Sequence, residues 1–121
     1  MAKIMVVEDD VQASTFLAEV LSAEGYLPII VNESSRAMSM ANATLPDAFL
    51  LDLMMPEPDG FRLCRMLRGN PNFIGSPIII VTALDDTDSR IVAFGAGAND
   101  YIVKPFHIDE LSAKLKGLLK S

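Results

Sequence analysis

Three consecutive acids, Glu8, Asp9 and Asp10, directly follow the apolar segment 4–7. A β-branched segment of this kind predicts a short strand, so the acids stand at its carboxyl end. Carboxylates this close repel one another, and burial in a crevice would raise their pKa values unless a cation offset the charge. Such oxygen ligands suit a hard divalent cation of the magnesium or manganese type. The alternative is that the acids cap the following helix, a role that Asp10 can fill alone.

Asp52, Thr82 and Lys104 also belong to the ends of predicted strands. The apolar segments that carry them span residues 49–55, 78–81 and 101–103. Taken alone, Asp52 is either a chemical group or the start of the turn into Pro56. In an open α/β sheet, however, ligands bind at the carboxyl ends of the strands. Four strands would thus each deliver a polar group to one rim, which separate helix caps do not explain.

Strand and helix patterns alternate five times, which predicts a parallel sheet with helices on both faces. The other two strands are expected at residues 4–7 and 27–31. The helices are expected at residues 11–24, 34–44, 61–67, 85–95 and 108–118. Pro28 has no N–H to donate, so its strand should lie at a sheet edge. The helix that begins at Ser34 or Ser35 has a thin apolar face and should be the least stable.

The length of 121 residues favours one domain, spanning residues 1–121. The net charge is −6, and no cluster of Lys or Arg occurs. Direct binding to nucleic acid or to an anionic membrane is therefore not expected, because both need a basic face. The sequence has neither a signal-peptide pattern nor an apolar stretch of about 18 residues, which favours a cytoplasmic protein. Cys64 should pack in the core, and His107 should lie on the surface.

Four segments, VVEDD, LLDLMMPEPDG, VTA and GANDYIVKPF, resemble the receiver domain of bacterial two-component response regulators. The spacing agrees, with 30 residues from Asp52 to Thr82 and 22 from Thr82 to Lys104. The resemblance covers the whole chain. It implies a flavodoxin-like (βα)5 fold, a doubly wound parallel sheet of strand order 2-1-3-4-5.

The resemblance also implies a phosphorelay role. Asp52 would accept a phosphoryl group from a histidine kinase or a histidine phosphotransfer protein, and Thr82 and Lys104 would bind phosphoryl oxygens. Mg²⁺ would be held by Glu8, Asp9, Asp52 and the backbone carbonyl of Met54. The domain would be a phosphoacceptor that assists its own phosphorylation and slow dephosphorylation, rather than an enzyme. A cation and Lys104 would offset the repulsion between the phosphoryl group and the carboxylate.

Further expectations from the resemblance concern the switch and the partner surface. Tyr101 aligns with the switch aromatic of the family, whose ring would turn inward as Thr82 moves toward the phosphoryl group. Relatives of the winged-helix class form ion pairs across a symmetric dimer. The residues at the matching charged positions here are Arg90, Asp100, Glu110 and Lys114. Because Lys lacks the bidentate fork of the usual Arg, a weak, phosphorylation-dependent homodimer is expected. The Lys104–Pro105 peptide bond should be cis, as in the family.

The sequence departs from the commonest pattern of the family without losing a catalytic group. Glu8 stands where Asp is usual, and Asn99 stands where many relatives carry an acid. Met54 and Leu84 occupy the two positions that flank the approach of water in the family. Neither can orient a water molecule, so a long-lived phosphorylated state is expected.

Three other functions agree less well with the sequence. A phosphatase of the haloacid dehalogenase type needs a second acid two residues after its nucleophile, where Met54 stands. A flavin-binding flavodoxin needs a hydroxyl- and glycine-rich loop in place of residues 8–10. The strongest alternative is a receiver-like interaction module that works without phosphorylation. Loss of Asp52, Asp9 or Lys104 would mark such a module, and all three are present.

Overall fold

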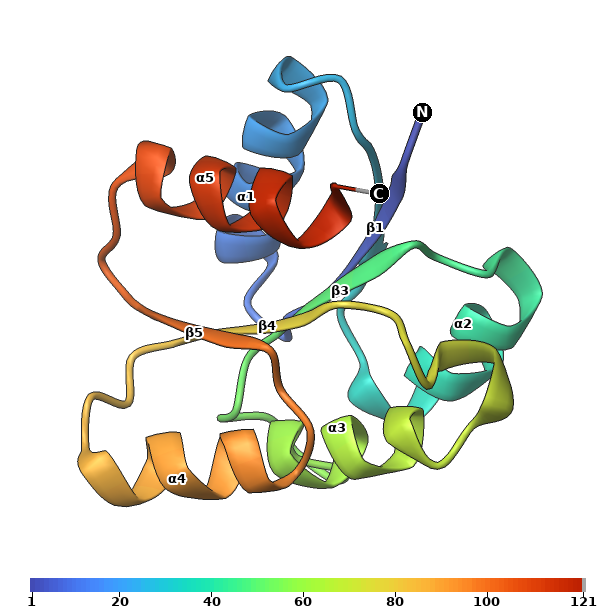
Figure 1. The fold of residues 1–121 in the computed structure, drawn as a ribbon, viewed down its shortest axis with the longest axis vertical. Coiled ribbons are helices and arrows are strands. Elements are labelled where there is room, and N and C mark those ends of the chain that lie inside the picture. Colours follow the sequence, from blue (N-terminus) through green and yellow to red (C-terminus); the bar gives the residue numbers. More distant parts are fainter. Residues whose placement is uncertain (121) are drawn as a thin grey trace.

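The computed structural model describes residues 1–120 and consists of a parallel sheet between two layers of helices (Figure 1). The strands are β1 (Lys3–Val7), β2 (Leu27–Val31), β3 (Ala48–Leu51), β4 (Ile78–Thr82) and β5 (Asp100–Val103). The helices are α1 (Val11–Ala23), α2 (Ala37–Thr44), α3 (Gly60–Arg68), α4 (Thr87–Gly95) and α5 (Ile108–Leu119). Two short 3-10 helices are η1 (Ser34–Arg36) and η2 (Pro71–Phe73).

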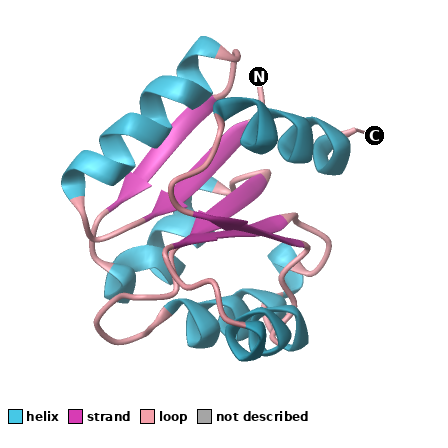
Figure 2. Ribbon diagram, turned by 90° about the vertical axis from the view of Figure 1, so that its left-hand side faces the viewer, coloured by secondary structure: helices cyan, strands magenta, loops and turns pink. Residues whose placement is uncertain are grey.

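The strand order is β2-β1-β3-β4-β5, with every neighbouring pair parallel, which confirms the predicted flavodoxin-like topology. Helices α1 and α5 cover one face of the sheet, and α2, α3 and α4 cover the other (Figures 1 and 2). Pro28 lies on the edge strand β2, as predicted, in register with Ile4. The adjacent N–H of Leu27 donates to the carbonyl of Ala2 at 2.9 Å. Since alternate residues bond to the same neighbour, the nitrogen of Pro28 faces away from β1 and costs no sheet hydrogen bond.

Side chains along each strand alternate between the two faces of the sheet. In β1, Met5 and Val7 pack with α2, α3 and α4, whereas Ile4 and Val6 pack with α1 and α5. All four are buried, which explains why a central strand has a continuous apolar sequence. Cys64 is buried in the first of these clusters, as predicted, and burial raises the pKa of its thiol.

Strand β3 ends at Leu51, so Asp52 lies just beyond its carboxyl end, as predicted, although the apolar segment runs on to residue 55. Leu53 and Met55 are apolar because the loop between β3 and α3 folds back into the core, where they are 2% and 9% exposed. Asp59 ends this loop by accepting a hydrogen bond from the N–H of Arg62 at 2.9 Å. Asp52 is consequently the first residue beyond the strand.

Helix α2 is preceded by η1, which starts at the predicted Ser34. The Ser34 hydroxyl does not cap the helix, because it donates to the carbonyl of Pro56 at 2.8 Å. That bond ties the start of η1 to the loop after β3. Among residues 1–120, no helix combines the length and the apolar character that crossing a membrane requires.

Candidate functional site

The carboxyl ends of four strands bring Glu8, Asp52, Thr82 and Lys104 together at one edge of the sheet. Hydrogen bonds of the sheet continue just beyond the strands. The N–H of Asp52 donates to the carbonyl of Val7 at 3.1 Å, and the N–H of Lys104 donates to the carbonyl of Thr82 at 2.8 Å. The backbone of each of these two site residues is therefore fixed to a neighbouring strand. The Lys104–Pro105 peptide bond is cis, as expected.

The ammonium of Lys104 lies between two carboxylates. It contacts Oε1 of Glu8 and lies 3.3 Å from Oδ2 of Asp52. Glu8 is 2% exposed and Asp52 is 8% exposed. Buried charges need partners, and here one cation serves two anions. The site therefore retains negative charge that a further cation can offset.

Carboxylate oxygens of Glu8, Asp9 and Asp52 lie within 4.8 Å of one another. Asp9 is exposed at the rim, while the other two acids are buried. An all-oxygen set with excess negative charge has the donor chemistry that Mg²⁺ prefers. Asp10 does not belong to this set, because its Oδ1 accepts hydrogen bonds from two N–H groups in the first turn of α1 at 2.9 and 3.3 Å. Asp10 is thus the cap that the sequence predicted.

Burial opposes the charge of each site group, and the partners decide the direction of each pKa shift. Burial alone would raise the pKa of Asp52. Hydrogen bonds from the Met54 N–H and the Thr82 hydroxyl, together with the charge of Lys104, hold it below its ordinary value. Burial raises the pKa of Glu8, and the hydrogen bond with Lys104 opposes that rise only in part. Burial alone would lower the pKa of Lys104, but Glu8 and Asp52 raise it. Asp52 is therefore anionic and Lys104 cationic at neutral pH.

A close backbone contact holds the loop that follows Asp52. The N–H of Gly60 donates to the carbonyl of Leu53 at 3.2 Å, and Gly60 is buried against the backbone of Asp52. No side chain fits at position 60 without displacing that backbone. The sequence indicated only a turn here, and the glycine of that turn was the one signal for the contact.

Asn32, the first residue after β2, supports the acids and was not identified from the sequence. Its Nδ2 donates to the carbonyl of Glu8 at 2.8 Å and to the hydroxyl of Ser14 at 2.9 Å. The side chain thereby joins the end of β1 to β2 and α1. An Asn in a loop carries no sequence signal for this role, because its partners come from two other elements.

Tyr101 has its ring in the inward position. The residue is 4% exposed, and its hydroxyl donates to the carbonyl of Leu84 at 2.7 Å. The N–H of Leu84 lies 3.5 Å from Oγ1 of Thr82, with geometry for a hydrogen bond. The loop between β4 and α4 thus contacts both residues of the expected switch. The inward ring, which was expected of the phosphorylated form, is the conformation seen in the structure.

Three of the four charged residues expected on the partner surface have partners within the chain. Nζ of Lys114 lies 2.9 Å from Oδ1 of Asp100. Nη2 of Arg90 lies 3.2 Å from Oδ1 of Asp85. Glu110 is exposed in the first turn of α5. A dimer through this surface would therefore have to compete with pairs that already exist.

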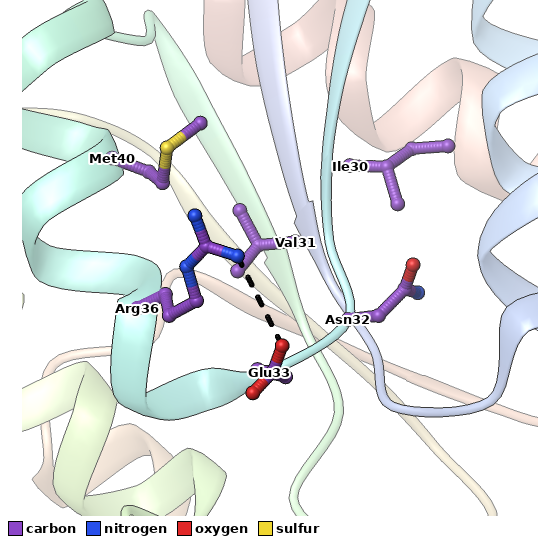
Figure 3. A pocket seen from close by; sticks show the side chains of 6 residues that line it. All are labelled: Ile30, Val31, Asn32, Glu33, Arg36 and Met40. Carbon is purple, nitrogen blue, oxygen red and sulfur yellow. Dashed lines mark ion pairs between the residues drawn. The ribbon is translucent and has the colours of Figure 1, made fainter.

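A pocket of about 210 Å³ lies between β2 and α2 (Figure 3). Its lining is formed by Ile30, Val31, Asn32, Glu33, Arg36 and Met40. The ion pair across it, between Glu33 and Arg36, has a separation of 3.9 Å and two largely exposed side chains. Such a pair contributes little, and no buried polar group of the pocket points to a ligand. Among the described residues, the buried charged side chains are Glu8 and Asp52, at the acidic edge.

Comparison with known proteins agrees with this geometry. Residues 4–116 match the response regulator receiver domain. The chain is 39% identical over 118 residues to the response regulator MprA of Mycobacterium tuberculosis (strain ATCC 25177 / H37Ra), which covers 98% of this chain and 50% of that protein. The chain thus spans about half the length of the curated relatives that it matches.

Solved structures give the same result. The BeF3-activated receiver domain of RstA from Klebsiella pneumoniae has a TM-score of 0.92 and 35% identity, over 98% of this chain and 99% of that one. The receiver domain of a sensor histidine kinase from Pseudomonas aeruginosa PAO1, which has a magnesium ion in its active site cleft, has a TM-score of 0.91 and 32% identity, over 99% and 98% of the two chains. The chain belongs to the response regulator receiver domain family.

Proposed function

We propose that this receiver domain accepts a phosphoryl group on Asp52, in a Mg²⁺-dependent reaction, from a histidine kinase or a histidine phosphotransfer protein. The observation that carries the proposal is the Lys104 ammonium between Glu8 and Asp52, beside Asp9. An acid that served only solubility would be exposed and would not share a cation with a second carboxylate. The magnesium ion in the cleft of the Pseudomonas receiver domain supports the same assignment for the acids.

The residues of the site have distinct tasks in such a transfer. A carboxylate oxygen of Asp52 attacks phosphorus as the bond from phosphorus to the donor imidazole breaks, and the imidazole nitrogen keeps the electron pair. The lowered pKa of Asp52 keeps the attacking group ionised at neutral pH. The Thr82 hydroxyl and the Lys104 ammonium can each donate a hydrogen bond to a phosphoryl oxygen.

The metal site is assigned to the same edge. Mg²⁺ would be held by Glu8, Asp9, Asp52 and the carbonyl of Met54. When bound, the ion supplies positive charge that offsets the repulsion between the phosphoryl group and the carboxylates. Because Asp52 itself becomes modified, the domain acts as a phosphoacceptor signalling component that assists its own phosphorylation. Partner proteins recognise its modified state, and the domain itself contacts neither nucleic acid nor membrane. It acts in the cytoplasm.

Intact-mass spectrometry tests the proposal directly. Incubation with acetyl phosphate and Mg²⁺ should add the mass of one phosphoryl group to the wild type. Asp52→Asn should remain unmodified, and a chelator should prevent the reaction. Asp88→Asn, which changes an exposed acid on α4, should react as the wild type does. An unmodified wild type under saturating donor would contradict the proposal and favour the phosphorylation-independent interaction module.

A further inference from the structure

Arg90 lies where α4 meets β5 and contacts two parts of the switch region. Its guanidinium carbon is 4.7 Å from the centroid of the Tyr101 ring. Its Nη2 is 3.2 Å from Oδ1 of Asp85, in the loop between β4 and α4. A guanidinium over an aromatic face is attracted by the electrons of the ring. Arg90 therefore holds the ring and the loop at the same time.

Other contacts of the ring come from the same region. Phe94, one helical turn after Arg90, has its ring centroid 6.4 Å from that of Tyr101. Residues four apart share one face of a helix, so α4 presents both side chains to the tyrosine. The Tyr101 hydroxyl donates to the carbonyl of Leu84, again in the loop before α4. The inward position thus depends on how α4 and this loop are placed.

The loop also leads to the phosphoacceptor site. Leu84 contacts Thr82 through its N–H and Tyr101 through its carbonyl oxygen. The Thr82 hydroxyl in turn is one of the groups that lower the pKa of Asp52. A movement of the loop would therefore change the contacts of Thr82 and Tyr101 together.

We propose that Arg90 is a positioning residue for Tyr101, and that it stabilises the inward ring before any phosphoryl transfer. By lying over the ring and pairing with Asp85, it closes the loop between β4 and α4 over the tyrosine. Arg90 thereby sets the fraction of the resting population that already has the inward ring. The meaning of that fraction for signalling rests on the proposed function, whereas the fraction itself can be measured without phosphorylation.

The size of the effect follows from the contacts. Loss of an exposed cation–π contact should change the ratio of inward to outward rings by about two- to fivefold. Lys carries the charge but lacks the planar fork, so its ammonium can lie over the ring but cannot pair with Asp85 at the same time. Arg90→Lys should therefore retain part of the effect, while Arg90→Gln should retain none.

Fluorine NMR on protein labelled with 3-fluorotyrosine measures the fraction directly. The sequence contains two tyrosines, Tyr26 and Tyr101, so Tyr26→Phe assigns the signals. In unphosphorylated protein, Arg90→Gln should shift the Tyr101 signal toward that of a solvent-exposed ring. Asp85→Asn should give a smaller shift in the same direction. The Tyr26 signal and the urea unfolding midpoint report whether each variant remains folded.

A matched control is Arg62→Gln, which removes another exposed pair of Arg and acid, with a separation of 3.0 Å to Glu57. It should leave the Tyr101 signal unchanged. A folded Arg90→Gln variant with an unchanged Tyr101 signal would overturn the proposal, as would an equal shift in the Arg62→Gln control.

A second measurement separates this proposal from the proposed function. Beryllofluoride with Mg²⁺, a phosphoryl mimic, should increase the inward fraction more in Arg90→Gln than in the wild type, because the variant starts from a lower value. If Arg90→Gln shifts the Tyr101 signal and beryllofluoride changes neither protein, the positioning role is supported and phosphorylation at Asp52 is contradicted.

Discussion

A Cβ atom on Gly60 would lie 2.1 Å from the carbonyl oxygen of Asp52 and 2.7 Å from Cα of Leu53. The first residue of α3 is therefore in direct backbone contact with the proposed phosphoacceptor. Real Cβ atoms do not come this close to backbone atoms, and backbone cannot move aside as a flexible side chain can. The position of Asp52 thus depends on the absence of a side chain at position 60.

Gly60→Ala should displace the loop between β3 and α3 and reduce the rate of phosphorylation by acetyl phosphate. The strain should lower the free energy of unfolding by about 1–3 kcal/mol, measured by urea titration. Gly117→Ala is the control, because a Cβ atom there meets open space. In the α5 helix it should raise stability by up to ~1 kcal/mol. Wild-type values for Gly60→Ala in both assays would show that the loop adjusts freely.

The two buried acids of the site, Glu8 and Asp52, should make the stability of the fold depend on pH, with opposite signs. The pKa of Glu8 is raised, mainly by burial, so the folded chain binds this proton more tightly than the unfolded chain. Ionised Glu8 therefore lowers stability above its ordinary value of 4.5, and this cost disappears as the pH falls through the raised pKa. The contribution of Asp52 to stability has the opposite sign. Its pKa is lowered, so ionised Asp52 adds stability above its ordinary value of 3.8, and this stability is lost as the pH falls through the lowered pKa.

Protons should consequently compete with Mg²⁺ for Glu8 before they compete for Asp52. Calorimetric titration should show that Mg²⁺ affinity falls as the pH is lowered from neutral toward the raised pKa of Glu8. Glu8→Gln should bind Mg²⁺ more weakly at neutral pH and lose most of this dependence. Glu33→Gln, an exposed acid outside the metal set, should behave as the wild type does. Equal pH dependence in Glu8→Gln would exclude Glu8 as the group responsible.

The parts of this fold that the sequence predicted are those fixed by local pattern and topology. The buried strand 78–82 needs apolar residues on both faces, so its sequence is unmistakable. Asp52 and Lys104 meet because the carboxyl ends of parallel strands share one edge, whatever their separation in sequence. The course of the chain after Asp52 could not be predicted, since Leu53 and Met55 are as apolar in a buried loop as they would be in a strand.

The contacts that each side chain makes were predicted less well than the strand or helix on which it lies. Arg90 was assigned to a partner surface from its place in the sequence, but the packing of α4 on β5 puts its guanidinium over Tyr101. Asn32 supports the site through hydrogen bonds of its side-chain amide, and Gly60 does so through close backbone packing. Such contacts depend on tertiary packing, and a single sequence carries little information about them.

Dimerisation through the surface formed by Arg90, Asp100, Glu110 and Lys114 should be weak and should require phosphorylation. Exposed ion pairs contribute about 0–1 kcal/mol each, and Lys114 already pairs with Asp100 within the chain. Sedimentation analysis should find monomers without a phosphoryl mimic, and Glu110→Lys should weaken the dimer formed with one. A tight dimer in unphosphorylated protein would contradict this expectation.

The phosphorylated state should be long-lived for a receiver domain, because Met54 and Leu84 cannot orient an attacking water. Met54 is 56% exposed beside the site, and its N–H donates to Oδ1 of Asp52 at 3.1 Å. Positioning of the water is worth ~1–3 kcal/mol, or about one to two decades in rate. The double variant Met54→Asn, Leu84→Glu should therefore lose its phosphoryl group about ten- to a hundredfold faster, followed by intact mass after removal of the donor.

Leu84 also packs against the core, so its replacement can change the loop as well as the path of water. Met54→Asn alone leaves that packing intact and should accelerate the loss by a smaller factor. Met66→Asn is the control, since Met66 is an exposed methionine on α3 that is not expected to flank the water path. If neither the double nor the single variant is faster than this control, these side chains do not govern access of water. The lifetime would then be set by partner proteins that remove the phosphoryl group.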